Sequence, residues 1–223
     1  MKYKMCVWDL DGTLLNTLPS LHYYNNKSLE HYGFKKITYK DSIDLIKYPL
    51  GQYYQNLLIL GGCPVDKVDE IVDDLTEYDY KMYNDNPLYL VEEFPDIKET
   101  LIQLNELGII NAIFSNKFEE ICIKTIHHFY PSLIKYVSGQ LIDSPPKPNV
   151  GCLDRLTKQS NISLDEMLLI GDTQVDILTA RNNNTKVAAV SWGYQDLDVL
   201  KEYKPDYIIH NPKEVLDIIK GDK

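Results

Sequence analysis

The feature that most constrains the fold is a short apolar run near the start of the chain, Met5–Trp8. Polar and apolar residues do not alternate along it, which is the pattern of a strand buried on both faces of its sheet. The run ends abruptly in two carboxylates, Asp9 and Asp11, and Gly12 follows with backbone freedom that other residues lack. We therefore expect an inner strand of a sheet that carries helices on both sides.

The two acids point to a ligand site. In open α/β sheets, ligands bind in the crevice beyond the carboxyl ends of the strands. Like charges gathered there need a cation or hydrogen bonds, and Mg²⁺ suits a site made of oxygen ligands. A plain Asp-Gly surface turn is the alternative. An EF-hand is excluded because Leu14 stands where its glycine belongs and Ser20 where its glutamate belongs.

The chain is expected to contain two parts. Residues 17–87 show helical patterns separated by glycine and proline breaks, and no strand pattern. The four helices predicted there are Leu18–Tyr32, Tyr39–Lys47, Gly51–Leu60 and Val65–Asn84. We predict a helical domain over residues 17–87, inserted after the first strand of a core built from residues 1–16 and 88–223.

From Phe94 onward, helix and strand patterns alternate, which is typical of βαβ units. The strands predicted there are Ile109–Phe114, Tyr136–Ser138, Met167–Ile170, Lys186–Val190 and Tyr207–Ile209. The helices are Asp96–Leu107, Lys117–Tyr130, Gly151–Gln159, Gln174–Asn182, Leu197–Glu202 and Lys213–Ile219. The predicted fold is α/β, with a doubly wound, mostly parallel sheet in a Rossmann-like core.

Three further strands end in polar residues. Ser115–Lys117 follows one strand just ahead of a predicted helix, an arrangement that suits an anion or simply caps the helix. Lys147 lies between prolines, either held for a phosphate or exposed in a turn. Asp172 and Asp176 lie one helical turn apart; capping explains one acid but not a second that repels it. In a parallel sheet all these groups lie along one edge.

The set Asp9–Thr13, Ser115–Lys117, Lys147-Pro148 and Gly171-Asp172 with Asp176 resembles the haloacid dehalogenase superfamily of phosphatases over nearly the whole chain. The triplet Ser115–Lys117 and the run Ser191–Tyr194 are most similar to its phosphoglycolate phosphatase branch, which carries an α-helical cap. The resemblance implies an enzyme, a Mg²⁺-dependent phosphoric monoester hydrolase, for which 2-phosphoglycolate is the first substrate to consider.

The resemblance also implies roles for the acids and for one lysine. Asp9 would attack phosphorus and form an aspartyl-phosphate, while Asp11 would act as acid and then as base. Lys147 would offset the surplus negative charge. The Mg²⁺ ligands would be Asp9, the backbone carbonyl of Asp11, Asp172 and Asp176, the last directly or through water.

Substrate contacts are implied for four further residues: Ser115, Asn116, Thr13 and, in the cap, Lys47. The loop Ile46–Gly51, which holds Lys47, is the expected recognition loop. Alternatives within the fold are a β-phosphoglucomutase-like phosphotransferase and a pyrophosphatase. A carbon–halogen hydrolase would leave Asp172 and Asp176 unexplained, and a phosphonate hydrolase would need Lys47 as its cap lysine. A non-catalytic binding module should have lost a catalytic residue, and none is missing.

The composition of the chain limits its possible binding partners and its cellular compartment. The formal net charge of −10 argues against nucleic acid, whose affinity depends on lysine and arginine contacts to phosphate. The four scattered cysteines form no CxxC pair, which indicates a reducing compartment. The N-terminal apolar run is too short for a signal peptide, and no stretch is long enough for a membrane span. We expect a cytoplasmic protein with a small phosphorylated metabolite as partner, and the sequence leaves monomer and homodimer open.

Overall fold

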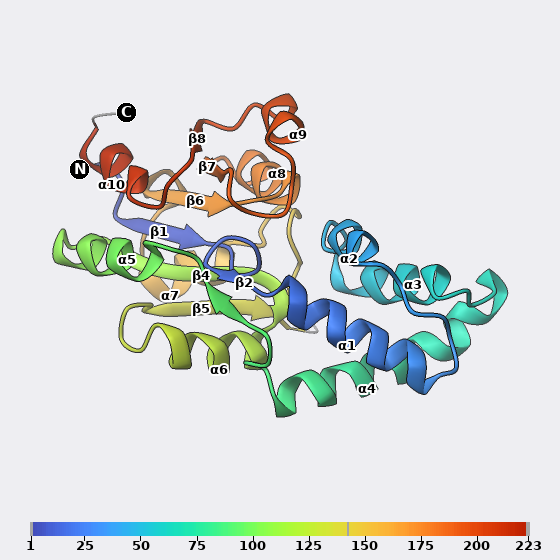
Figure 1. The fold of residues 1–223 in the computed structure, drawn as a ribbon. Helices are drawn as coiled ribbons and strands as arrows, with labels where there is room; N and C mark the ends of the chain where they lie inside the picture. The colour runs from blue at the N-terminus through green and yellow to red at the C-terminus, as the bar shows by residue number, and fades with distance from the viewer. Residues whose placement is uncertain (1, 142, 222–223) are drawn as a thin grey trace. The chain divides into compact units, whose positions relative to one another are not determined.

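The computed structural model describes residues 2–141 and 143–221. It contains a six-stranded sheet in the order β5–β4–β1–β6–β7–β8, and every neighbouring pair is parallel (Figure 1). The strands are β1 (Met5–Trp8), β4 (Ile110–Phe118), β5 (Tyr136–Gln140), β6 (Met167–Gly171), β7 (Lys186–Val190) and β8 (Tyr207–Ile209). The predicted α/β class and parallel sheet are confirmed.

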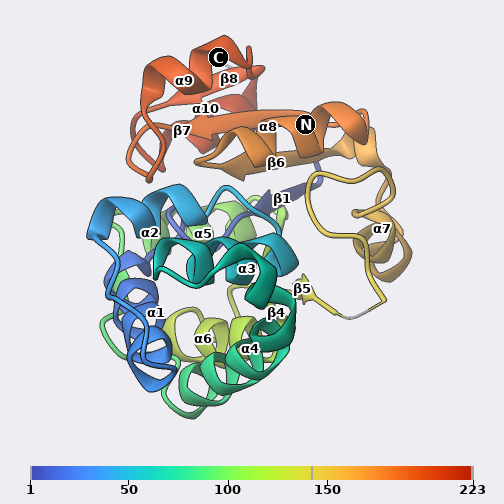
Figure 2. The same cartoon turned by 90° about the vertical axis from the view of Figure 1, so that its right-hand side faces the viewer.

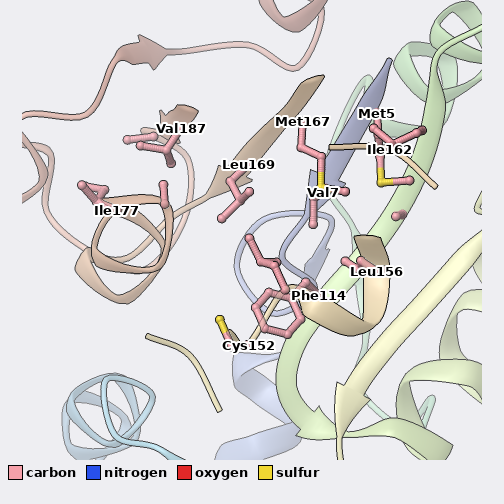
Figure 3. Packing of buried hydrophobic residues seen from close by; sticks show 14 of the residues in the cluster. Met5, Val7, Phe114, Cys152, Leu156, Ile162, Met167, Leu169, Ile177 and Val187 are labelled. Carbon is pink, nitrogen blue, oxygen red and sulfur yellow. The ribbon is translucent and has the colours of Figure 1, made fainter. Parts of the chain in front are cut away.

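Helices cover both faces of this sheet. Apolar side chains of α7 (Asp154–Ser160), α8 (Gln174–Asn182) and α9 (Leu197–Glu202) pack with Met5 and Val7 of β1 in one buried cluster (Figure 3). On the opposite face, Trp8 donates a hydrogen bond to the side chain of Asn111, which donates to the carbonyl of Leu101 in α5 (Ile97–Glu106). α6 (Glu119–Phe129) and α10 (Glu214–Lys220) complete the helices of the core. Burial on both faces explains why polar and apolar residues do not alternate along β1.

A second, two-stranded antiparallel sheet joins β2 (Leu15–Asn16) to β3 (Glu92–Glu93). Neither strand was predicted, because two residues are too few to show an alternation of polar and apolar side chains. β2 ends where the chain leaves the core, and β3 begins where it returns: the described residues form two compact units, one up to Asn16 and from Glu92 onward, the other Thr17–Val91.

The unit Thr17–Val91 is a bundle of four α-helices (Figure 2). They are α1 (Leu18–His31), α2 (Tyr39–Leu45), α3 (Leu50–Leu60) and α4 (Val68–Asp85), the last preceded by a 3₁₀ turn at Val65–Lys67. Its interior is partly polar: the carboxylate of Asp79 is buried and accepts hydrogen bonds from the hydroxyls of Ser28 and Tyr54. Among the described residues, no helix of either unit has the length and apolar character needed to cross a membrane.

Two predicted helix starts in the core are wrong, and two predicted strands end too early, since β5 continues to Gln140. β4 continues to Phe118, so Lys117 lies in a strand and α6 begins only at Glu119. Ser115 and Asn116 therefore belong to the end of β4 rather than to a helix cap. The helix predicted from Gly151 begins three residues later, at Asp154. The pairing of Phe118 with Gln140 keeps the end of β4 extended, and the N–H of Gly151 donates to Oδ1 of Asn183 outside any helix.

Candidate active site

The carboxyl ends of four neighbouring strands bring the candidate residues of the core together. Asp9 follows β1, Ser115 lies near the end of β4, Lys147 lies in the segment after β5, and Asp172 follows β6. These strands are adjacent in the sheet and parallel, so their ends share one edge. The structure thus gathers the predicted groups of the core in one place, although they are spread over more than 160 positions of the sequence.

Three carboxylates and one ammonium group form the centre of the site. One oxygen from each of Asp9, Asp172 and Asp176 lies within 4.8 Å of the others. Nζ of Lys147 lies 3.0 Å from Oδ1 of Asp9 and 2.7 Å from Oδ1 of Asp176. The side chains of Lys147 and Asp176 are only 5% and 3% exposed, so little water screens these charges.

The electrostatics of the acids favour the binding of a cation. Burial raises the pKa of Asp9 to about 7: Lys147 opposes the rise, while Asp176 and Asp11 add to it. Burial also raises the pKa of Asp172 well above its ordinary range, with Asp9 and Asp176 contributing. Carboxylates held this close at neutral pH need compensation by a cation. The donor set, all oxygen, fits a divalent metal such as Mg²⁺.

Asp172 is held by its neighbours. Oδ1 accepts a hydrogen bond of 3.1 Å from the hydroxyl of Thr13, and Oδ2 accepts one of 2.8 Å from the backbone N–H of Tyr194. The indole of Trp192 donates to the carbonyl of Thr13, which ties the segment after β7 to the turn after β1. Thr13, predicted as a substrate contact, thus supports Asp172. In the sequence, the Trp192–Tyr194 segment suggested only a branch of the family. Nothing in the sequence predicted that it supports Asp172 and Thr13.

Lys147 and Asp176 are equally constrained. Oδ2 of Asp176 accepts hydrogen bonds from the hydroxyl and the backbone N–H of Thr173, in a capping box at the start of α8. Burial alone would lower the pKa of Lys147, but the carboxylates of Asp176 and Asp9 raise it overall, so the ammonium stays charged. Its Nζ also lies 5.3 Å from the centre of the Phe114 ring, within range of a cation–π contact.

Asn116 engages the backbone of Lys147 through both ends of its amide. Its Oδ1 accepts from the N–H of Lys147 at 2.8 Å, and its Nδ2 donates to the carbonyl of Lys147 at 3.3 Å. The geometry places Asn116 as a support for Lys147. Ser115 is buried, and its Oγ accepts the backbone N–H of Lys117, so its hydroxyl hydrogen can be donated to a ligand.

Two further lysines of the predicted motifs and loops form ion pairs. Lys117 had no role of its own in the sequence analysis, yet its Nζ lies 2.7 Å from Oδ1 of Asp11. Its place in the triplet with Ser115 was the only signal in the sequence, and a helix rather than a strand was predicted to begin at Lys117. Lys47 lies in the helical unit, where its Nζ pairs with Oδ1 of Asp44 at 2.6 Å.

The chain matches the model of the haloacid dehalogenase-like hydrolase family over residues 6–190. It therefore belongs to this family of hydrolases. Pyrophosphatase PpaX of Halalkalibacterium halodurans is 27% identical over 220 residues, which cover 98% of each chain. Phosphoglycolate phosphatase of Vibrio parahaemolyticus is 24% identical over 97% of this chain and 96% of its own.

Solved structures agree on the fold. The crystal structure of a putative phosphoglycolate phosphatase from Lactobacillus delbrueckii subsp. bulgaricus superposes with a TM-score of 0.86 over 98% of this chain and 99% of its own, at 23% identity. At this identity the likeness supports the shared architecture, a parallel sheet with a helical insertion, and nothing finer.

Proposed function

We propose that the chain is a Mg²⁺-dependent phosphatase that hydrolyses a small phosphate monoester through an aspartyl-phosphate on Asp9. The observation that carries the proposal is the cluster of Asp9, Asp172 and Asp176 with Lys147 between two of them. Three acids around one buried ammonium are poorly suited to a structural ion pair, since the negative charge is in excess. They suit a centre that receives a metal and a phosphate.

The proposed chemistry has two steps. A carboxylate oxygen of Asp9 attacks phosphorus, the bond from phosphorus to the ester oxygen breaks, and the departing oxygen takes a proton from Asp11. Asp11 then takes a proton from a water molecule that attacks the phosphorus of the aspartyl-phosphate. The bond from phosphorus to Asp9 breaks and inorganic phosphate leaves, so that Asp9 is again a carboxylate and Asp11 again carries its proton.

Mg²⁺ would be held by the carboxylates of Asp9 and Asp172 and the backbone carbonyl of Asp11. Both oxygens of Asp176 already accept hydrogen bonds, which favours a contact through water for this residue. When bound, the ion supplies positive charge that stabilises the phosphoryl group in the transition state.

The remaining residues of the core orient these groups. The hydroxyl of Ser115 and the ammonium of Lys147 would hold phosphoryl oxygens, because both are buried donors at the edge of the sheet. We assign Asn116 to positioning Lys147, and Thr13 to positioning Asp172, on the hydrogen bonds described above. In the cap domain, proposed over residues 17–87, Lys47 remains a proposed contact for the rest of the substrate.

The relatives divide over the substrate. Some are named phosphoglycolate phosphatase and others pyrophosphatase, at similar identity over nearly the whole chain. We therefore propose 2-phosphoglycolate as the first substrate and inorganic pyrophosphate as the second. A β-phosphoglucomutase-like phosphotransferase is the third candidate and shares the aspartyl-phosphate.

Phosphate release from these compounds tests the proposal. The assay compares wild type with Asp9→Asn, with Mg²⁺ and with EDTA, on 2-phosphoglycolate, pyrophosphate and glucose phosphates. Mg²⁺-dependent turnover that falls by at least about 10³-fold in Asp9→Asn supports Asp9 as nucleophile. The ratio of kcat/KM between the compounds identifies the preferred substrate. Turnover that survives EDTA or Asp9→Asn would refute the mechanism, and conversion of glucose phosphate isomers without phosphate release would favour the mutase.

A further inference from the structure

The ion pair between Lys117 and Asp11 is a feature of the site that the proposed mechanism does not use. Nζ of Lys117 lies 2.7 Å from Oδ1 of Asp11, and the two side chains are 6% and 14% exposed. Lys147 pairs instead with Asp9 and Asp176. Each lysine thus pairs with a different part of the acidic cluster.

An irregularity in the sheet delivers Lys117 to this position. Phe114 of β4 pairs with Ser138 of β5, but the next pair is Phe118 with Gln140. Three residues of β4 therefore lie opposite a single residue of β5. Such bulges redirect side chains and are frequent beside active sites.

The backbone around Lys117 is fixed from both sides. Its N–H donates to Oγ of Ser115 at 3.2 Å, and its carbonyl accepts from the thiol of Cys122 in α6 at 3.6 Å. The side chain itself is confined by burial, so the ammonium is left with little freedom. Asp11 lies beyond the end of β1, in the segment that leads to β2.

A purely structural ion pair explains these observations less well. Burying two charges carries a desolvation penalty that a pair of apolar side chains would avoid, so such a pair is weak evidence for stability. This pair, moreover, holds the one carboxylate that the mechanism requires to transfer protons. Proton transfer demands a heavy-atom distance of about 2.6–3.2 Å, and a displacement of about 1 Å can lower the rate about 10²-fold.

We infer that Lys117 is a positioning residue that holds the carboxyl group of Asp11 in line for proton transfer. The inference rests on the proposed function, in which Asp11 is acid and base. Lys117 acts through Asp11 and touches neither phosphorus nor the leaving oxygen, so its removal affects turnover only as long as Asp11 is present.

A double-mutant cycle tests this dependence. The variants are Lys117→Met, Asp11→Asn and the two combined, assayed on 2-phosphoglycolate and pyrophosphate with Mg²⁺. We expect Lys117→Met to lower kcat about 10- to 100-fold with KM nearly unchanged. In the Asp11→Asn background the same substitution should change kcat less than about 2-fold, because the group it positions is already gone. Lys117→Arg should recover part of the loss, since it keeps the positive charge.

A substrate with a good leaving group gives a second measurement. Nitrophenolate leaves phosphorus without needing a proton, so formation of the aspartyl-phosphate from p-nitrophenyl phosphate depends little on Asp11. In single-turnover measurements, Lys117→Met and Asp11→Asn should both slow the first step with 2-phosphoglycolate much more than with p-nitrophenyl phosphate. A merely structural role of Lys117 would slow both equally.

The control is Lys186→Met, which removes a lysine paired with Asp206 elsewhere in the same sheet and should leave kcat unchanged. The inference would be overturned if the fold-loss in kcat of the double variant equalled the product of the two single losses. A rise in KM with kcat unchanged would also overturn it and make Lys117 a substrate contact. If Lys117→Met does not fold, the same cycle is run with Lys117→Arg and Lys117→Gln. Full turnover by Asp11→Asn would refute the role of Asp11 itself, whereas a large loss there with none in Lys117→Met would refute the inference alone.

Discussion

Around Asp172, the space left for neighbouring residues is very small. A Cβ on Gly193 would lie 2.1 Å from Cβ of Asp172, and a Cβ on Gly12 would lie 2.3 Å from its Oδ2. Gly12 also has a φ of 82°, a conformation that other residues rarely adopt. The two glycines let the turn after β1 and the segment after β7 close on one carboxylate from both sides, which fixes its direction.

Gly193→Ala should therefore weaken the binding of Mg²⁺. The added methyl group must displace Asp172, and changes of this kind next to a metal ligand typically lower metal affinity by about 10- to 100-fold. The measurement is a Mg²⁺ titration followed by thermal unfolding and by phosphate release. Gly51→Ala in α3 is the matched control for the titration followed by thermal unfolding, because no atom lies within 4 Å of its added Cβ. It is not used for phosphate release, since Gly51 belongs to the expected recognition loop. Equal titration curves for Gly193→Ala and wild type would contradict this account of the site.

A site residue could be predicted only where its neighbours in the sequence reveal its position in the fold. Asp9, Asp172 and Asp176 each follow a short apolar strand, so their position at the edge of the sheet could be predicted from the chain alone. Asn116, Thr13 and Tyr194 support other residues through hydrogen bonds to partners 22 to 159 positions away. No spacing in the sequence encodes such partners, and the sequence analysis assigned two of the three to the substrate.

At the scale of elements, the end of β4 shows where a sequence pattern fails to predict the bounds of a strand. Ile110–Phe114 has the apolar character of an inner strand, whereas the polar residues after it suggest a helix start. The backbone stays extended because Phe118 regains its pairing with β5 after the bulge. A tertiary contact thus overrides local preference. The four residues of β1 and the nine of α8 had no such competing contact, and both elements have the predicted bounds.

The junction of β5, α6 and α7 depends on one arginine. The guanidinium of Arg155 donates to Oγ of Ser138 and to the carbonyl of Gly139 in β5, and it pairs with Glu119, the first residue of α6. Glu119 in turn accepts the backbone N–H of Gly139. A planar group with several donors can serve all three partners at once, and a lysine cannot.

Arg155→Met should lower the free energy of unfolding by about 1–3 kcal/mol, because it leaves half-buried acceptors without their donor. In a chain of this length each kcal/mol corresponds to a fall in Tm of about 2–4 °C. Arg181→Met, which removes an exposed side chain bonded to the carbonyl of Tyr203, is the control and should change stability by less than about 0.5 kcal/mol. Chemical denaturation measures both. Equal effects of the two substitutions would refute the role of Arg155 at this junction.

For the whole molecule, fold class and insertion could be predicted, but strand order could not. Alternating helix and strand patterns after Phe94 are sufficient for a parallel sheet with helices on both faces. The order β5–β4–β1–β6–β7–β8 places β1 in the middle, beside two strands that begin 105 and 162 residues after it. Pairing over such distances depends on which apolar faces fit together, and the pattern of polar and apolar residues does not specify that.

The charge balance of the site should make the stability of the whole chain depend on pH and on Mg²⁺ together. In the folded protein the pKa of Asp9 is about 7 against an ordinary value of 3.8, and that of Asp172 is raised as well. Between about pH 4 and 7 the folded chain therefore keeps protons that the unfolded chain releases, so stability without metal falls as pH rises through this window. Burial lowers the pKa of His22, which acts in the opposite direction. Metal binding requires the ionised carboxylates, so the stabilisation by Mg²⁺ grows with pH.

Thermal unfolding between about pH 5 and 7.5 measures this coupling. In EDTA we expect the Tm of wild type to fall across this range, and a saturating concentration of Mg²⁺ to remove the fall. At a hundredfold excess over its Kd, a ligand that binds only the folded state adds about 2.7 kcal/mol. Asp172→Asn removes one charge from the cluster, so in EDTA its Tm should exceed that of wild type near pH 7.5, and Mg²⁺ should raise it little. A wild-type Tm in EDTA with the same pH dependence as that of Asp172→Asn would show that the acids do not repel one another as the structure implies.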